Sequence, residues 1–445
     1  MDFIKKKKIK SWAKYYSGNY FLYKPKTVDE IKKILSENTK LIPSGGFRSY
    51  GDSAFSDNII SCRSYNKIIK FDKLTGVITA QAGTTLCEIL SNVVPHGWFL
   101  GVSPGTKYTT LGGAIASDVH GKNHHKDGSI SNYIEWIEII NNEGKIVRCS
   151  RNENKELFLW TVGGMGLTGV IIKVAFFLKP INTGWIVQEL FVGKNISKTF
   201  EIFEQNINST YLVAWIDCYA KGNNLGRSLV MTGEHAKKEE INLRNKFNTF
   251  EIPKKLKLKI PFFFPSFVLS NFSVKIFNYL NFLLGKLKKG RKIIDWDSFF
   301  YPLDKLLNWN KIYGYRGFVQ FQCVIPLTNA NNGISELLKC ISQSKSSSFL
   351  AVLKRFGKQD SKFSFPMEGY SLALDFPINK QNLLLLDSLD EITIKYGGRF
   401  YLAKDSRVSR KTFERSDERI RSFKSFRRKK LSQRFNSCQS DRLGL

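Results

Sequence analysis

The chain has 445 residues, roughly three times the length of a typical domain, so two or three domains are expected. Apolar residues make up 42% of it and charged residues 24%, which excludes a disordered, collagen-like or disulfide-scaffold protein. Lys and Arg number 69 against 38 Asp and Glu. The net charge of +31 is typical of proteins that contact polyanions, such as nucleic acid, an anionic membrane or phosphorylated substrates.

Most of the excess charge lies in three segments. Residues 1–10, 254–292 and 410–434 carry +4, +10 and +8, and the rest of the chain holds +9, which indicates local docking surfaces. The second segment surrounds an apolar stretch, residues 260–285, whose prolines and Lys275 make it unsuited to span a membrane. Phe and Leu flanked by lysines favour an interfacial segment on anionic lipids, and a lid packed on its own protein fits the stretch equally well.

The cysteines and the N-terminus bear on the compartment. Seven scattered cysteines without a C-x-x-C pair favour neither a zinc site nor a disulfide framework, and they indicate a reducing compartment. The N-terminal stretch is basic but is followed by no apolar run, so we expect no secretory signal peptide.

The predicted elements follow an α+β order. Up to residue 180, helices are expected at 85–94, 110–117 and 153–162, and strands at 41–46, 68–72, 76–83, 134–141, 145–149 and 170–178. Beyond about residue 182 the glycine density falls, and strands are expected at 214–220, 318–326 and 370–377. A second domain is therefore predicted to begin near Gly184.

The first candidate site is SGGFRSYGDSA, residues 44–54, which directly follows a predicted strand. Its three glycines allow backbone N–H groups to approach an anion, and Arg48, Ser49 and Tyr50 add donors. This composition is typical of a diphosphate cradle, and a simple tight turn is the alternative.

The second candidate site is VSPGTKYTTLGGAIASDVHGKNHHKDGS, residues 102–129. Gly112 and Gly113 begin a helix of small residues whose N–H groups suit a phosphate or a flat ring. His120, His124 and His125 follow within six residues, at a spacing that does not fit a zinc site. Solvated loop histidines are the alternative, but the density of these residues beside Gly-rich turns favours a binding site.

Three later strings are interpreted from the spacing of their residues. GMGLTG, residues 164–169, matches G-x-G-x-x-G but follows a predicted helix and precedes a strand, so we reject a Rossmann site. Gln320 and Gln322 are two residues apart on one predicted strand, so their amides are expected on the same face. Spacing alone favours a snorkelling surface lysine at Lys404, and an anion-directed lysine is the alternative.

Taken in order, these strings resemble a known family. SGGFRSYGD, LGGAIASDVHGKNHH, LFLWTVGGMGLTGVI, GFVQFQCVIP, FLAVLKRFG, LALDFP and GGRFYLAKDSR are similar to the decaprenylphosphoryl-β-D-ribose 2′-oxidases of the vanillyl-alcohol-oxidase superfamily. The resemblance covers nearly the whole chain. It implies an α+β fold in which residues 1–181 and 399–445 form a PCMH-type FAD-binding domain, and residues 182–398 form an inserted substrate domain built on an antiparallel sheet.

The resemblance also implies roles for individual residues. Lys404 and His120 would be catalytic, with the Lys404 cation beside the flavin, which overturns the surface reading of that lysine. FAD would be lined by Pro43, Ser44, Gly45, Gly46, Phe47, Arg48, Ser49, Tyr50, Gly51, Asp52, Ser53, Gly105, Thr110, Leu111, Gly112, Gly113, Ser117, Asp118, Val119, His120, Ile171 and Tyr401. The substrate would be bound by Lys122, Trp215, Gln320, Gln322, Val352, Lys354 and Phe356.

The chain also departs from the family pattern. Many members of the superfamily bond the flavin covalently through a histidine of the first Gly-rich loop, where this chain has Arg48, and no cysteine lies between residues 88 and 148. FAD is therefore expected to be non-covalent. The remaining departures concern the substrate pocket more than the flavin site, and they are Phe300, Val213, Lys311, Ser371 and Ala373.

The leading functional hypothesis is an FAD-dependent oxidoreductase of cell-wall or polysaccharide biosynthesis. It would oxidise the 2′-OH of a polyprenyl-phosphate-linked ribofuranose to the keto sugar, and a keto-sugar reductase would complete the epimerisation to arabinose. The protein would be cytoplasmic and peripheral to the inner face of the membrane. The alternatives are an aldonolactone or polyol oxidase with a soluble substrate, and a basic nucleic-acid- or membrane-binding protein. The sequence contains no recognisable nucleic-acid-binding motif, so nucleic acid is not expected as a partner.

Overall fold

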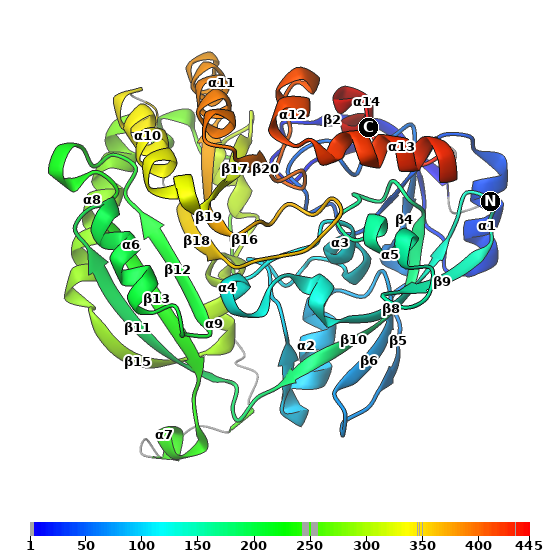
Figure 1. Cartoon of the computed structure of the whole chain (residues 1–445), viewed down its shortest axis with the longest axis horizontal. Coiled ribbons are helices and arrows are strands. Elements are labelled where there is room, and N and C mark those ends of the chain that lie inside the picture. Colours follow the sequence, from blue (N-terminus) through cyan, green and yellow to red (C-terminus); the bar gives the residue numbers. More distant parts are fainter. Residues whose placement is uncertain are drawn as a thin grey trace.

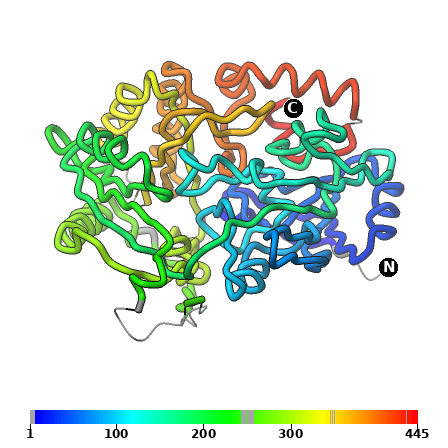
Figure 2. The backbone as a smooth tube through the Cα atoms, turned by 60° about the horizontal axis from the view of Figure 1, so that its bottom comes forward, coloured from blue at the N-terminus to red at the C-terminus, as the bar shows by residue number. Residues whose placement is uncertain are grey.

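The computed structural model places the chain in two halves (Figure 1). One half, blue to cyan, contains two sheets, and the other, green to orange, is built on a single large sheet. Both termini lie in the first half, which the view of Figure 2 confirms. The C-terminal helices α12 (Arg410–Ser416), α13 (Arg419–Lys430) and α14 (Cys438–Leu443) return to it. The structure describes residues 4–242, 249–250, 257–344, 346, 348, 350–431 and 433–445.

A four-stranded sheet forms the N-terminal part of the first half. Helix α1 (Val28–Glu37) begins at Thr27, whose side chain accepts a hydrogen bond from the Glu30 N–H, and it buries Ile31 and Ile34. Strands β2, β4 and β3 run parallel to one another, and β1 at one edge runs antiparallel to β2. The order is β1 (Ile4–Lys10), β2 (Ser17–Tyr23), β4 (Asn58–Ser61), β3 (Ile42–Ser44).

The second sheet of this half is antiparallel. Helix α2 (Leu86–Val93) begins with a capping box between Thr85 and Glu88, and α3 (Leu111–Ala116) begins at Thr110. Helix α5 (Lys155–Thr161) precedes the GMGLTG turn and β10 follows it, which confirms that this motif does not have the Rossmann order. The strand order is β5 (Ile68–Phe71), β6 (Val77–Gln81), β10 (Val170–Pro180), β8 (Ile134–Ile140), β9 (Ile146–Ser150), with β7 (Trp98–Leu100) also on β10.

An eight-stranded antiparallel sheet forms the second half, and the predicted α+β fold class is confirmed. Phe321 and Cys323 of β17 pack in the apolar core under α6 (Ile196–Gln205), α10 (Ala330–Gln343) and α11 (Lys380–Lys395). Because side chains alternate along a strand, the residues of β17 that alternate with Phe321 and Cys323 face the first half of the molecule. The order is β15 (Gly290–Asp295), β11 (Trp185–Gly193), β13 (Ser228–His235), β12 (Tyr211–Ile216), β18 (Ala351–Phe356), β19 (Gly369–Pro377), β17 (Phe318–Pro326), β20 (Arg399–Phe400).

The remaining helices and strands of the described residues are short, apart from α8, and lie outside the three sheets above. The boundary predicted near residue 182 falls between β10 and β11, and the domain division itself stays a prediction. These elements are α4 (His124–Asp127), α7 (Lys238–Asn242), β14 (Leu258–Lys259), α8 (Asn271–Leu287), α9 (Trp296–Phe300) and β16 (Leu306–Leu307). Of the basic segment 254–292, Lys254 and Lys255 lie outside the described residues.

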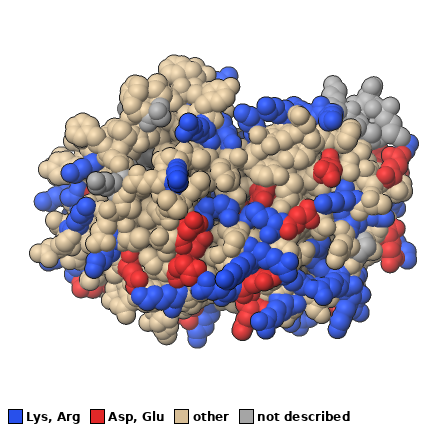
Figure 3. Space-filling model, turned by 90° about the horizontal axis from the view of Figure 1, so that it is seen from above, with Lys and Arg blue, Asp and Glu red and all other residues tan. Residues whose placement is uncertain are grey.

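Some basic residues of the C-terminal segment pair with carboxylates. Arg415 pairs with Glu391 at 2.8 Å, and Lys424 and Arg410 both pair with Glu414. Figure 3 shows Lys and Arg over much of the face seen from above, with Asp and Glu among them. The charge of residues 410–434 therefore serves in part to hold helices together.

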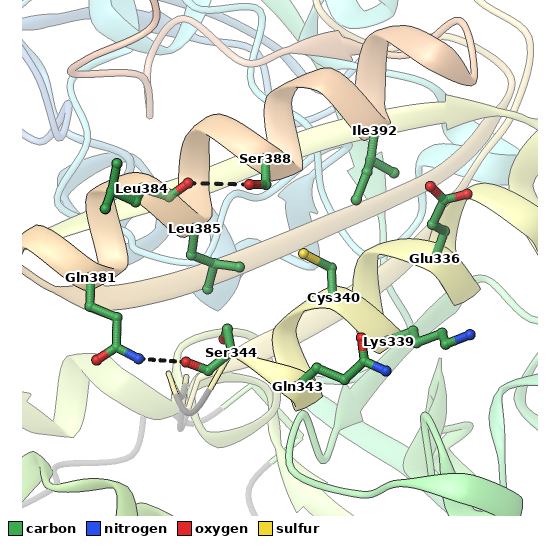
Figure 4. A pocket seen from close by; sticks show the side chains of 10 residues that line it. All are labelled: Glu336, Lys339, Cys340, Gln343, Ser344, Gln381, Leu384, Leu385, Ser388 and Ile392. Atoms are coloured by element: carbon green, nitrogen blue, oxygen red, sulfur yellow. Dashed lines mark hydrogen bonds between the residues drawn. The ribbon is translucent and has the colours of Figure 1, made fainter.

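A surface groove of about 520 Å³ separates α10 from α11 (Figure 4). Glu336, Lys339 and Cys340 line it from one helix, and Leu384 and Ser388 from the other. These helices cover the apolar face of the large sheet, so the groove is separated by that sheet from the polar face described below.

Candidate active site

The first Gly-rich motif forms a tightly enclosed loop after β3. A Cβ atom on Gly51 would lie 2.0 Å from the carbonyl oxygen of Asp405, and one on Gly45 would lie 2.0 Å from Thr110 Oγ1. Phe47 has a left-handed backbone, with φ of 51°. None of the backbone N–H groups of residues 45–49 donates a hydrogen bond within the described part of the chain. The loop thus keeps a row of donors available for an anion.

Contacts from the C-terminal segment hold this loop in place. The Tyr50 N–H donates to the Ala403 carbonyl at 3.0 Å. Arg442 of α14 donates to both carboxylate oxygens of Asp52, at 2.9 and 2.8 Å, and to Asp405 at 2.8 Å. The Asp52 carboxylate, expected to line the cofactor, is thus engaged by Arg442.

Other members of the predicted loop set lie around its edge. Ser44 donates its hydroxyl to the Ala54 carbonyl at 2.8 Å, and Ser53 is buried. The guanidinium of Arg48 lies 4.4 Å from the ring of Trp12 and 5.3 Å from that of Tyr108. Pro43 belongs to β3, and a Cβ on Gly46 would contact the Tyr108 carbonyl at 3.1 Å.

The second motif lies directly against the first. Thr110 touches Gly45 and accepts a hydrogen bond from the Gly113 N–H at 3.3 Å. A Cβ atom on Gly112 would lie only 2.9 Å from the Cβ of Ala82. Gly105 faces open space, and the Ser117 carbonyl accepts from the Tyr401 hydroxyl at 3.0 Å. The predicted residues Leu111, Val119, Ile171 and Asp118 are all buried beneath this surface.

His120 occupies the boundary between the two halves. Its Nε2 lies 3.0 Å from the amide nitrogen of Gln322, and its buried Nδ1 has no partner in the described structure. Its ring lies 4.8 Å from Phe356 and 5.0 Å from Tyr401. Burial, with Lys354 nearby, lowers the pKa of His120 well below its usual value, so the ring is neutral.

The other two histidines of the motif hold the loop. His124 Nε2 lies 2.7 Å from Gln359 Oε1, and the amide of Gln359 donates to Asp118 at 2.7 Å. His125 Nε2 lies 2.8 Å from the Ser209 carbonyl. His120 and His124 both lie against Phe356 of the large sheet, and the ring nitrogen of His120 lies beside Gln322.

One face of the large sheet presents polar side chains toward the first half. Gln320 and Gln322 alternate with the core residues Phe321 and Cys323 along β17, which confirms that both amides lie on one face. By strand register, the predicted Lys354, Val352 and Trp215 belong to the same face, and Phe356 closes it beside His120 and His124. The structure thus brings the predicted substrate residues together.

The departures from the family pattern divide between this face and other places. Ser371 and Ala373 pair in register with Lys354 and Gln322, and Val213 lies on β12. Phe300 packs against Phe99 at 5.0 Å, 5.9 Å from the Lys122 ammonium. Lys311 donates to the Pro261 carbonyl at 2.8 Å, in the segment that follows β14.

Three lysines converge on the site. The Lys404 ammonium lies 3.6 Å above the ring of Tyr50, and that of Lys122 donates to the Phe299 carbonyl. Burial, with Lys354 nearby, lowers the pKa of Lys122 to about 7, and burial lowers that of Lys354 to about 8. Burial also lowers the pKa of Lys404, while Asp375 opposes that effect. An anion bound here would relieve the accumulated positive charge.

Asp375 is a site residue that sequence reasoning missed. It is fully buried on β19, directly opposite Gln320, and it accepts a hydrogen bond from the Gln320 amide. The available signal was an acidic residue inside the apolar string LALDFP, since a buried carboxylate in a strand needs a partner.

These residues fit a flavin dinucleotide. The loop at residues 45–49 presents N–H donors suited to a diphosphate, and the helix that begins at Thr110 lies against it. Lys404 supplies a partly buried ammonium group from the C-terminal segment.

Comparisons with known proteins agree with this geometry. Residues 21–150 match the family described as "FAD binding domain". The chain is 32% identical to decaprenylphosphoryl-β-D-ribose oxidase of Mycolicibacterium smegmatis over 86% of this chain and 85% of that protein. It is 26% identical to L-gulonolactone oxidase of Mus musculus over 39% of this chain and 40% of that protein.

The protein is an FAD-dependent oxidoreductase that acts on CH–OH groups. Within that class, the chain belongs to the decaprenylphosphoryl-β-D-ribose oxidase family.

Proposed function

We propose that the protein oxidises the 2′-OH of a polyprenyl-phosphate-linked ribofuranose to the keto sugar, the first half of an epimerisation to arabinose. The bound FAD would supply the hydride acceptor. A keto-sugar reductase is the expected partner. The observation that carries the proposal is the convergence of Lys122, Lys354 and Lys404 on one face of the large sheet.

The side chains divide the substrate between them. Lys122 and Lys354 would bind the phosphate, because two partly desolvated ammonium groups gain most from an anion. Gln322, held between His120 and the Ser371 hydroxyl at 3.4 Å, would position the sugar. His120 is neutral and has a free Nδ1, so it would exchange a hydrogen bond with a sugar hydroxyl.

A soluble lactone or polyol is the second candidate substrate, supported by the partial match to L-gulonolactone oxidase. The two lysines favour the phosphorylated lipid, because a neutral lactone leaves their charge uncompensated. The direct test is anaerobic bleaching of the yellow holoenzyme by lipid-linked ribose, with L-gulonolactone and polyols in parallel. Bleaching by the soluble compounds alone would overturn the proposal.

FAD is further proposed to be bound without a covalent link. Arg48 lies where a covalent histidine would be expected in the superfamily, and Trp12 and Tyr108 hold its guanidinium. Acid precipitation should therefore release all of the yellow colour into the supernatant. Colour retained in the pellet would contradict this.

Helix α8 supports a peripheral contact with an anionic membrane face, the inner face for a cytoplasmic protein. On one side of α8, Val274 and Asn278 are buried, and Gly285 packs against Leu229. The outer side exposes Phe272 (74%), Leu280 (50%) and Leu287 (83%), along with Lys275, Lys286, Lys288 and Lys289. No helix of the described residues is long and apolar enough to cross a bilayer. An apolar stripe with flanking lysines is suited to anionic lipid headgroups.

Vesicle sedimentation tests this contact. The protein should bind vesicles of anionic phospholipid at least tenfold more tightly than zwitterionic ones, and F272D/L280D should abolish the binding. The control is Leu384→Asp in the groove between α10 and α11, which replaces a leucine that is at least as exposed (59%) as Leu280 (50%). Equal loss in the control variant would contradict a role for α8.

A further inference from the structure

Asp375 and Lys404 belong to one cluster of side chains at the site. The ring of Tyr50, on which Lys404 rests, lies 5.3 Å from that of Phe318, which stacks on Tyr313 at 4.2 Å. The Asp375 side chain accepts from the Gln320 amide and from the Tyr313 hydroxyl, the latter at 3.4 Å. Its backbone N–H donates to Ser348 Oγ at 3.1 Å, which fixes the strand at this point. Lys404 comes from the C-terminal segment, and its ammonium rests on the ring of Tyr50.

Among the described residues, the other groups that face Lys404 are neutral or positive, and the carboxylate of the adjacent Asp405 is engaged by Arg442 at 2.8 Å. Burial raises the pKa of Tyr50 and of Tyr313 well above the usual value, so both phenols are neutral. His120 is neutral, and Lys354 adds a further positive charge that opposes protonation of Lys404. Asp375 is therefore the anionic group of the cluster that favours the ammonium form of Lys404.

We propose that Asp375 is a positioning residue that holds Lys404 in its ammonium form and that Gln320 orients the Asp375 carboxylate for this task. The inference rests on the proposed role of Lys404 beside the flavin. A flavin receiving hydride gains negative charge near its N1 and C2 carbonyl, so a neutral amine at Lys404 would stabilise it far less.

The arrangement explains why a carboxylate occupies a fully buried strand position. Burial raises the pKa of the Asp375 carboxyl and lowers that of Lys404, and their mutual attraction opposes both effects. Replacing Asp375 by Asn preserves shape but removes the attraction, so Lys404 should lose its proton at lower pH. The pKa of Lys404 can only fall in this variant, because Lys354 remains as a repelling cation.

The primary test is carbon-13 NMR of the substrate-free holoprotein labelled at lysine Cε. The Lys404 signal is assigned by its absence in Lys404→Met. Asp375→Asn should move the titration of this signal to lower pH by more than one unit, and Gln320→Glu, which adds a carboxylate, should move it upward. An unchanged midpoint in either variant overturns the proposal.

Two further variants separate charge from structure. Q320E/D375N exchanges the amide and the carboxylate across the same strand pair, so it should restore the Lys404 midpoint to near that of the unsubstituted protein. Failure of this rescue overturns the role of charge. Asp390→Asn is the matched control, because Asp390 is a buried carboxylate bound to Arg407 at 2.7 Å on α11, and it should leave the midpoint in place.

Kinetics provide the functional readout. In Asp375→Asn the rate of anaerobic flavin reduction should fall at least tenfold at pH 8 and recover toward pH 6, because one pKa unit changes the ammonium fraction tenfold. A merely structural role would lower the rate equally at both pH values. The NMR titration needs no substrate, so it stands or fails independently of the lipid-linked ribose assay.

Discussion

The two walls of the site are built in different ways. The Gly-rich wall of the first half presents backbone N–H groups, and glycine positions such as Gly51 leave no space for a Cβ. The wall formed by the large sheet presents side chains, among them Gln320, Gln322, Lys354 and Asp375, on a regular strand lattice. The first wall depends on the exact path of the chain and the second on the identity of its side chains.

This difference predicts how each wall responds to substitution. A change in the Gly-rich wall displaces backbone and should reduce stability and FAD content together. A change on the sheet face, where the opposite face keeps its apolar core, should alter the chemistry while the fold is retained.

The largest effect is expected for Lys404→Met. Loss of the cation should slow flavin reduction by lipid-linked ribose about 10²- to 10³-fold, the usual consequence of removing one charge-stabilising group. FAD content should stay near one per chain. Stopped-flow absorbance measures the rate, and Lys339→Met in the groove between α10 and α11 is the control. An unchanged rate would refute the role of Lys404.

Arg442→Gln should destabilise the Gly-rich wall next most strongly. It leaves the buried carboxylates of Asp52 and Asp405 without their shared cation, at a cost of about 3 kcal/mol in the free energy of unfolding. Urea denaturation of the holoprotein measures the loss. Arg415→Gln breaks the exposed pair with Glu391 and should have a much smaller effect, because solvent screens that pair. Equal losses of stability in the two variants would contradict a special role for Arg442 in the Gly-rich wall.

Gly51→Ala should cost about 1 to 3 kcal/mol, because the new Cβ must displace the backbone of Asp405. The purified protein should also contain less FAD, as read from the ratio of flavin to protein absorbance. Gly105→Ala, where nothing lies within 4 Å of the added atom, is the matched control and should keep both properties. Full FAD content in Gly51→Ala would show that the loop tolerates displacement.

The smallest effect concerns pH. Burial lowers the pKa of His124 to about 4, so between pH 6.5 and 4 the unfolded chain binds a proton that the folded chain does not. This histidine makes the free energy of unfolding fall as pH decreases, by up to about 1.4 kcal/mol per unit. His124→Gln should remove that part of the slope, measured by urea denaturation from pH 7 to 5. An identical slope would mean that folding leaves the pKa of His124 near its usual value.

Much of the fold followed from local patterns. Alternating apolar residues located β6, β8, β10, β17 and β19, and the helix–glycine–strand order around residues 155–178 excluded a Rossmann site. The two Gly-rich loops and the histidine motif were also recognised from composition, because tight turns and anion contacts require particular residue types.

Tertiary structure alone decided which side chains meet. From spacing, Lys404 read as a surface lysine, and only the return of the C-terminal segment places it over Tyr50. Local patterns do not identify the partners of Asp375, because Gln320 and Tyr313 are more than 50 residues away in the chain. The sequence by itself determined the elements and the family, since both depend on local order. The charge of the site depends on burial and on distant neighbours, which exist only once the two halves have come together.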